Sequence, residues 1–232
     1  MRVDIWSDVV CPWCYIGKRR MEDALSRFDH AADIDVVWRA FELNPSAPAT
    51  YDGDNTDRLA RKYGVSRAEA EAMNERVTRI ADDEGLAFRL DIARPGNTFD
   101  AHRLLHLAAE RGRQDELKEE LLAAYQARAE AIGDHEVLVK AAVTTGLDEV
   151  EVRAVLQSDR YGDDVRADER AAQEIGVTGV PFFVFDGRYA VSGAQSSDVL
   201  LEVLQRAWTE RPPVQVVAGD ACGPEGCEVP AS

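Results

Sequence analysis

The feature that most restricts the fold of this chain is a cysteine pair, Cys11 and Cys14, placed between a strand pattern and a helix pattern. Before the pair, Val3 and Ile5 alternate with a charged residue, which is typical of a short, half-buried strand. After Cys11, Pro12 suits the first position of a helix, where a missing N–H is no loss. The pattern therefore predicts a strand, a short turn and a helix that has Cys11 at its N-cap.

The residues after the pair complete a β–α–β unit. Four apolar residues recur at a spacing of three to four, which indicates one buried helix face. They are Met21, Ala24, Leu25 and Phe28. Residues 34–38 (IDVVW) predict a second strand, parallel to the first if the helix is a right-handed crossover.

The far end of the chain supplies matching elements. Residues 182–185 (FFVF) predict an apolar strand, Asp186 and Gly187 a two-residue hairpin turn, and residues 188–191 its partner strand. A closing helix is expected from about Ser196 to the two prolines at 212–213. Strands at both ends imply one sheet, so we expect an α/β fold of the thioredoxin-like type.

A helical segment separates the two halves. Ser66 and Glu69 form a capping-box pattern before a helix that ends near Gly85. Apolar periodicity predicts further helices at about 101–112, 114–131, 135–145 and 148–158. We therefore predict a thioredoxin-like domain from residues 1–44 and 173–212, an all-helical insertion over 45–172, and a tail over 213–232 that contains a CxxxxC pair.

Charge and hydropathy restrict the partners. The chain has 43 acidic and 27 basic residues, a formal net charge of -16, which opposes binding to nucleic acid or to anionic membranes. Its apolar runs fall short of the roughly 20 residues needed to cross a bilayer. Residues 1–10 lack the basic and apolar regions of a secretion signal. We expect a cytoplasmic protein without nucleic-acid or membrane partners; the sequence does not predict its oligomeric state.

The compartment guides the interpretation of the thiols, because a reducing cytoplasm favours redox or metal-binding roles over a permanent disulfide. A helix N-terminus stabilises a thiolate, so we expect Cys11, with a mildly lowered pKa, to attack and Cys14 to resolve the mixed disulfide. Pro12 and Trp13 carry no ionisable group. Because neither residue places a positive charge beside the Cys11 thiolate, the sequence favours a reductase or isomerase over a strong oxidant.

Metal binding is the alternative role for these sulfurs. Cys222 and Cys227 could complete a four-sulfur zinc site with the first pair, but a zinc ribbon normally keeps its ligand pairs close in sequence. His102 and His106 share a helix face, yet two ligands are too few, and we expect packing or surface histidines. We predict no metal. The tail pair is a second redox pair, a terminus with exposed thiols, or a chance ligand pair.

At this point the motifs resemble a known family. The CPWC sequence near the start and GVTGVPFFVFDGRYAVSGAQ after the helical segment resemble the DsbA-like thioredoxin oxidoreductases, most closely the FrnE-type branch, over about residues 1–210. The resemblance implies that Pro181, preceded by Val180, is a cis proline facing the cysteines, and that the Val180 backbone pairs with an extended substrate. The alternative is that Pro181 starts an ordinary strand.

The resemblance also implies the substrates and the competing hypotheses. Partners would be disulfide-containing proteins or small thiols, with no bound cofactor. Related 2-hydroxychromene-2-carboxylate isomerases and kappa-class glutathione transferases generally have a serine where Cys11 stands. This chain has both thiols, so disulfide exchange is the first hypothesis. A glutathione-dependent isomerase or transferase, with glutathione as co-substrate, is the second. A non-enzymatic holdase or binding module, with an apolar groove between sheet and insertion, is the third.

Overall fold

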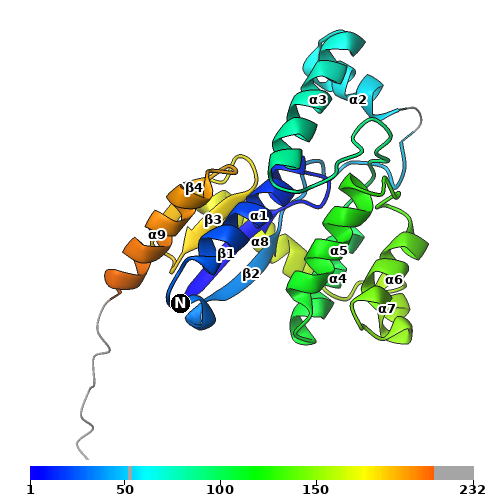
Figure 1. Ribbon diagram of the computed structural model, residues 1–232. Coiled ribbons are helices and arrows are strands. Elements are labelled where there is room, and N and C mark those ends of the chain that lie inside the picture. Colours follow the sequence, from blue (N-terminus) through cyan, green and yellow to red (C-terminus); the bar gives the residue numbers. More distant parts are fainter. Residues whose placement is uncertain (52–53, 212–232) are drawn as a thin grey trace, which may run out of the picture.

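The fold has one four-stranded sheet, in the order β2-β1-β3-β4 (Figure 1). The cysteine pair follows the β1 strand, at the start of the next helix. The structure is a computed structural model and describes residues 1–51 and 54–211. The strands are β1 (Arg2–Ser7), β2 (Asp35–Ala40), β3 (Phe182–Phe185) and β4 (Tyr189–Ser192). β1 pairs in parallel with β2 and antiparallel with β3, and β3 pairs antiparallel with β4. The predicted strands and the parallel first pair are confirmed.

Local sequence explains this sheet. In β1, Val3 and Ile5 are fully buried, and Ile5 stands beside Trp38 of β2 and Phe183 of β3. Asp186 and Gly187, between β3 and β4, both have positive φ values, 55° and 65°, as a tight turn requires. Phe185 pairs with Tyr189, so three residues connect the strands and not the predicted two. The sheet therefore places the turn after β1 beside the loop that leads into β3.

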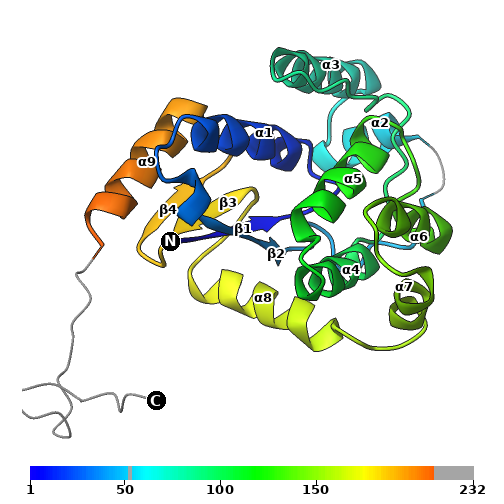
Figure 2. The ribbon, with the colours of Figure 1, turned by 60° about the horizontal axis from the view of Figure 1, so that its bottom comes forward.

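Helices cover both faces of the sheet (Figure 2). α1 (Pro12–Ser26) and α9 (Ser197–Thr209) lie together on one face, where they close the apolar core over Ile5 and Phe183. α8 (Gly162–Glu174) lies on the other face and packs against β2. Residues 162–172 of α8 belong to the predicted helical insertion, since periodicity shows that a segment is helical but not which surface its apolar face covers.

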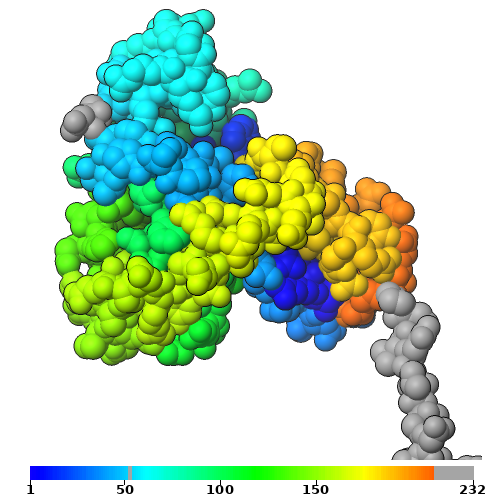
Figure 3. Space-filling view, turned by 180° about the vertical axis from the view of Figure 1, so that it is seen from behind, coloured from blue at the N-terminus to red at the C-terminus, as the bar shows by residue number. Residues whose placement is uncertain are grey.

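The remaining helices form two groups beyond the sheet. Their bounds are α2 (Asn55–Tyr63), α3 (Arg67–Asp83), α4 (Phe99–Glu110), α5 (Gln114–Gln126), α6 (His135–Thr144) and α7 (Glu149–Leu156), and a short 3-10 helix (Ala31–Asp33) precedes β2. α4 to α7 enclose their own apolar core, centred on Leu104 and Leu121. α2 and α3 form a lobe next to the start of α1, and from behind this cyan lobe stands above the yellow segment that contains α8 and β3 (Figures 1 and 3).

The helical segment agrees with several predictions. Ser66 and Glu69 form the predicted capping box at the start of α3. The helices expected after residue 101 are present with ends shifted by a few residues. α2 and most of α8 lie within the predicted helical segment, but they were not predicted as individual helices. Within the described residues, no helix is both long and apolar enough to span a membrane.

Candidate active site

The cysteine pair lies at the start of α1. Cys11 is the N-cap residue, in an extended conformation, and Cys14 lies one turn inside the helix. The turn after β1 closes with the Cys11 N–H donating to the carbonyl of Asp8 at 3.2 Å. Both cysteines are free thiols, and only 4% of Cys11 and 0% of Cys14 is exposed. The predicted N-cap position of Cys11 is confirmed.

The loop before β3 lies against Cys11. The Val180–Pro181 peptide bond is cis, as the resemblance implied. The Cys11 thiol donates a hydrogen bond to the Val180 carbonyl, with 3.5 Å between sulfur and oxygen. Pro181 also packs against Gly17 of α1, where an added β-carbon would lie 2.9 Å from the proline ring. Gly17 therefore allows α1 to approach the proline loop closely.

The two thiols titrate as a pair. Hydrogen bonding to Cys14 and burial raise the pKa of Cys11 well above its usual value. Burial also opposes ionisation of Cys14, but the hydrogen bond from Cys11 and the charge of Lys118 outweigh it, so the pKa of Cys14 is lowered. The expectation of a lowered pKa at Cys11 is thus wrong for the free dithiol, because it left out burial and the neighbouring thiol of Cys14.

Lys118 of α5 is a buried cation beside this dithiol. It is fully buried, and its ammonium group has no hydrogen-bond partner among the residues that the structure describes. The ammonium lies 5.5 Å from the centre of the Trp38 ring. Burial lowers the pKa of Lys118 to about 8, against the charges of Cys14 and Asp8, which raise it. Because water is excluded here, the charge of Lys118 stabilises a thiolate in the pair.

Asp8 adds a carboxylate to the same buried cluster. Only 1% of Asp8 is exposed, and one of its oxygens accepts the N–H of Leu43 at 2.8 Å. The other oxygen lies 3.5 Å from Nε2 of His102. Burial raises the pKa of Asp8, but His102 and the Leu43 N–H outweigh it and the net shift is downward. His102 is thus a buried neighbour of the site, whereas His106 faces Asp168 at 3.1 Å.

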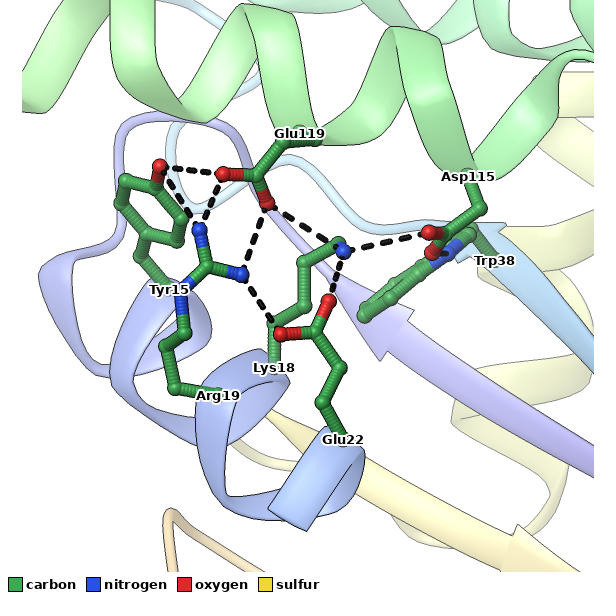
Figure 4. Close-up of polar contacts among 7 residues, drawn as sticks. All are labelled: Tyr15, Lys18, Arg19, Glu22, Trp38, Asp115 and Glu119. Carbon is green, nitrogen blue, oxygen red and sulfur yellow. Dashed lines mark hydrogen bonds and ion pairs between the residues drawn. The ribbon is translucent and has the colours of Figure 1, made fainter. Parts of the chain in front are cut away.

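A polar network joins α1 to α5 and also includes Trp38 of β2; it is here called the α1–α5 seam (Figure 4). Its members are Tyr15, Lys18, Arg19, Glu22, Trp38, Asp115 and Glu119. The ammonium of Lys18, which is 2% exposed, lies 3.2 Å from a Glu119 oxygen, and the Tyr15 hydroxyl donates to Glu119 at 2.6 Å. Glu119 directly follows Lys118, so the seam joins α1 to the turn of α5 that carries Lys118.

A cavity of about 340 Å³ opens beside Cys11. Cys11, Trp13 and Val180 contribute to one wall, and residues of α2 and α3 contribute to the other. Pro12, confirmed as the first residue of α1, also borders the cavity, and Trp13 is 38% exposed. Cys14 does not border it. A molecule in the cavity therefore reaches the sulfur of Cys11 and not that of Cys14.

Three further residues complete the comparison with the sequence predictions. Cys222 and Cys227 lie outside the described residues. Within residues 1–51 and 54–211, no group of three or more histidine, cysteine or acidic side chains is arranged to hold a metal ion. Lys118 was missed, although a lysine next to Leu117 and Leu121 in an apolar stripe is a detectable signal of a buried charge.

Comparison with known proteins gives three similar chains. A crystal structure described as a probable DsbA oxidoreductase, SCO1869 from Streptomyces coelicolor, is 48% identical, covers 100% of both chains and superposes with a TM-score of 0.91. The uncharacterized protein YwbO of Bacillus subtilis (strain 168) is 28% identical and covers 86% of this chain and 93% of its own. The cytosolic disulfide reductase DsbM from Pseudomonas aeruginosa, solved with GSH, is 15% identical, covers 90% of this chain and 100% of its own, and has a TM-score of 0.64, which shows a shared fold.

The model of one protein family matches almost the whole described chain. The match covers residues 2–205, from β1 to the last turns of α9. It includes the cysteine pair, the proline loop and the helices between β2 and β3. With a thiol pair at the start of α1 and a cis proline beside it, the chain belongs to the DSBA-like thioredoxin domain family.

Proposed function

We propose that the chain is a thiol–disulfide oxidoreductase, with a reductase or isomerase role, in which Cys11 attacks and Cys14 resolves. The observation that carries this proposal is the position of Cys11: of the two free thiols, it alone borders the cavity, next to the backbone of Val180. Disulfide exchange requires one accessible sulfur and a second within reach of it. The arrangement of Cys11 and Cys14 meets that requirement.

The raised pKa of Cys11 is compatible with attack by this residue. The charge of the pair lies first on Cys14, while the Cys11 thiol donates its hydrogen bond to the Val180 carbonyl. Transfer of the Cys11 proton to Cys14 moves the charge to the sulfur that a substrate reaches. Accessibility then decides which thiol attacks, while Lys118 stabilises the charge on either sulfur, since it acts on both.

Each step of the exchange balances. The Cys11 thiolate attacks one sulfur of the substrate disulfide, and the other substrate sulfur leaves as a thiolate that takes up a proton. Cys14 then loses its proton and attacks Cys11, which releases the second substrate thiol. Two electrons pass from the protein thiols to the substrate, and a Cys11–Cys14 disulfide remains. An added dithiol such as dithiothreitol reduces this disulfide and restores the starting state.

The proposed substrates are disulfide-containing proteins or small thiols and their disulfides, in a cytoplasmic setting. No bound cofactor is needed, since the electrons come from Cys11 and Cys14, and glutathione is a candidate co-substrate. The backbone of Gly179 and Val180 borders the cavity beside Cys11, so an extended segment of a substrate could pair with it.

Insulin reduction tests this proposal. The assay uses the Cys222→Ser/Cys227→Ser variant, so that thiols outside the described structure cannot contribute. In this background, Cys11→Ser should abolish insulin reduction, and Cys14→Ser should accumulate mixed disulfides that mass spectrometry detects on Cys11. Full activity of the Cys11→Ser variant would contradict the proposal.

The glutathione-dependent isomerase or transferase remains the second hypothesis, because the cavity has the size of a small-molecule site. It predicts saturable glutathione binding that survives replacement of both Cys11 and Cys14. Binding calorimetry on that double variant separates the hypotheses. Loss of turnover with Cys11→Ser in the insulin assay, together with no glutathione binding by the double variant, would favour disulfide exchange.

A further inference from the structure

Two cations of α2 line the cavity opposite the reactive thiol. Arg58 and Lys62 are four residues apart, so they share one face of the helix, and both border the cavity that Cys11 borders. We propose that Arg58 and Lys62 select anionic substrates, and that the substrate class is low-molecular-weight disulfides that carry carboxylates. This inference rests on the proposed function, and it adds the substrate class.

Arg58 is held by neutral groups. Its Nη2 donates to the Asn55 side-chain oxygen at 3.1 Å, and its guanidinium carbon lies 5.3 Å from the centre of the Tyr51 ring. Its Nε is buried without a hydrogen-bond partner in the described part of the chain. Arg58 therefore brings to the cavity wall a charge that no described acidic side chain neutralises.

Neighbouring acidic residues do not neutralise these cations. Asp54 and Asp57 lie at the start of α2, but both pair with Arg67 of α3, at 2.7 and 2.5 Å. Over residues 1–51 and 54–211, neither Arg58 nor Lys62 forms an ion pair. Lys62 is exposed at the cavity rim, with its ammonium 5.5 Å from the Tyr63 ring centre. Its charge is thus available to a ligand that enters.

The cavity differs in charge from the rest of the molecule. Asp8 is the single carboxylate among the described residues that line it, and Asp8 is buried and engaged by Leu43 and His102. The chain as a whole has a net charge of -16 and repels anions at long range. Two cations that line the same cavity as the thiol offset this repulsion at the point where the reaction occurs. They give an anionic disulfide an advantage over a neutral one.

The size of the cavity favours small substrates. Its volume of about 340 Å³ lies within the range of small-molecule sites, roughly 300–1,000 Å³. α2 and α3 form the wall opposite Cys11, so the approach of a folded protein surface is restricted on that side. A molecule with one carboxylate beyond its disulfide can place sulfur near Cys11 and the carboxylate near Arg58.

Three aliphatic disulfides of similar length test the inference: dithiodipropionate, which is dianionic, hydroxyethyl disulfide, which is neutral, and cystamine, which is dicationic. The measurement is the second-order rate of oxidation of the reduced Cys222→Ser/Cys227→Ser protein, followed by acid quench, alkylation and mass spectrometry. Each rate is divided by the rate at which the same disulfide oxidises dithiothreitol, because disulfides differ in intrinsic reactivity. We expect the normalised rates to fall from dianion to neutral to dication.

The variants separate local recognition from overall charge. Arg58→Gln should slow oxidation by dithiodipropionate about tenfold, since a hydrogen bond to a charged group contributes about 1.5 kcal/mol, and Lys62→Gln should slow it less. Hydroxyethyl disulfide should react with both variants at the wild-type rate, which shows that the dithiol is intact. Arg61→Gln, on the same helix but away from the cavity, removes the same charge and should keep the preference.

Equal normalised rates for the three disulfides would overturn the inference and leave the proposed function standing. So would a preference that Arg61→Gln reduces as much as Arg58→Gln. If insulin is reduced but none of the three disulfides oxidises the protein, the inference also fails. If Cys11→Ser reduces insulin as fast as the unsubstituted protein, the proposed function fails, which is a separate result.

Discussion

The two sides of the dithiol are built from different chemistry. On the sheet side, Cys11 contacts the Val180 carbonyl, and Pro181 packs against Gly17. These contacts are uncharged and close. On the helical side, Lys118 of α5 places a positive charge beside the sulfurs, and α2 places Arg58 across the cavity.

This contrast separates two tasks. The sheet side positions the reactive sulfur, because backbone and ring contacts leave little freedom of movement. The helical side adjusts charge, because the Lys118 ammonium acts on the thiolates, and the proposed role of Arg58 is to attract anionic substrates. Changes on the sheet side should therefore affect stability and reactivity together, whereas changes at Lys118 should affect the ionisation of the thiols first.

Replacement of Lys118 should give the largest effect. Lys118→Met removes a positive charge beside the pair, so the first pKa of the dithiol should rise by about one to two units, equivalent to about 1.4 to 2.7 kcal/mol. The effect should be greatest below about pH 8, because above that pH Lys118 itself loses its charge. The pH dependence of iodoacetamide alkylation in the Cys222→Ser/Cys227→Ser background measures the shift.

A matched control tests whether the shift is local. Lys140→Met removes the same charge from α6, where the side chain is 65% exposed, and should leave the alkylation midpoint unchanged. A more reducing potential should accompany the Lys118→Met shift, by about 30 mV per 1.4 kcal/mol. An unchanged midpoint in Lys118→Met would show that the helical side does not control the charge of the dithiol.

A substitution on the sheet side should have the next largest effect. Gly17→Ala would place a β-carbon 2.9 Å from the Pro181 ring and 3.3 Å from Phe183, so helix and loop must move apart. Overpacking of this kind costs about 1 to 3 kcal/mol. Urea unfolding should show that loss of stability, and insulin reduction should slow in parallel, because the same shift separates Cys11 from Val180.

Gly162→Ala is the control for Gly17→Ala. An added β-carbon at Gly162, the first residue of α8, meets Phe99 at 3.5 Å, an ordinary contact. Alanine there should change the free energy of unfolding by less than about 0.5 kcal/mol. If the two alanine variants behave alike, the close approach of α1 to Pro181 is not required for the site.

The sheet side could be predicted from sequence because its signals are local. A proline at a helix start places Cys11 at the N-cap, and alternating apolar residues identify the strands. The sequence pattern of the β–α–β unit also predicted the parallel pairing. Pro181 was different: the cis bond came from the family resemblance, since base rates favour trans at an ordinary X–Pro bond.

The helical side could not be predicted to the same extent, because its contacts join distant segments. Lys118 could be recognised as a buried cation from its apolar neighbours, but not as a neighbour of Cys14, which is more than a hundred positions away. Helix α2 was not predicted, so Arg58 had no place opposite the thiol. The raised pKa of Cys11 comes from its hydrogen bonding to Cys14 and from burial, which the sequence pattern does not reveal, so the expected lowered pKa was wrong.

The α1–α5 seam connects the two sides, and its loosening should give the smallest effect. Glu119→Gln weakens contacts to Lys18, Arg19 and Tyr15 while it keeps the shape of the side chain. Because Lys18 still pairs with Asp115 at 3.2 Å, the loss should be about 1 kcal/mol in urea unfolding. The alkylation midpoint should rise as in Lys118→Met, but by less.

Glu116→Gln on the same helix is the control, because among the described residues Glu116 pairs with Arg113 alone, at the surface and at 3.1 Å. An exposed pair of this kind contributes little, so both stability and alkylation midpoint should stay close to wild type. A Glu119→Gln variant that loses stability but keeps the wild-type midpoint would show that the seam braces α1 without positioning Lys118. The charge beside the dithiol would then depend on the packing of α5 alone.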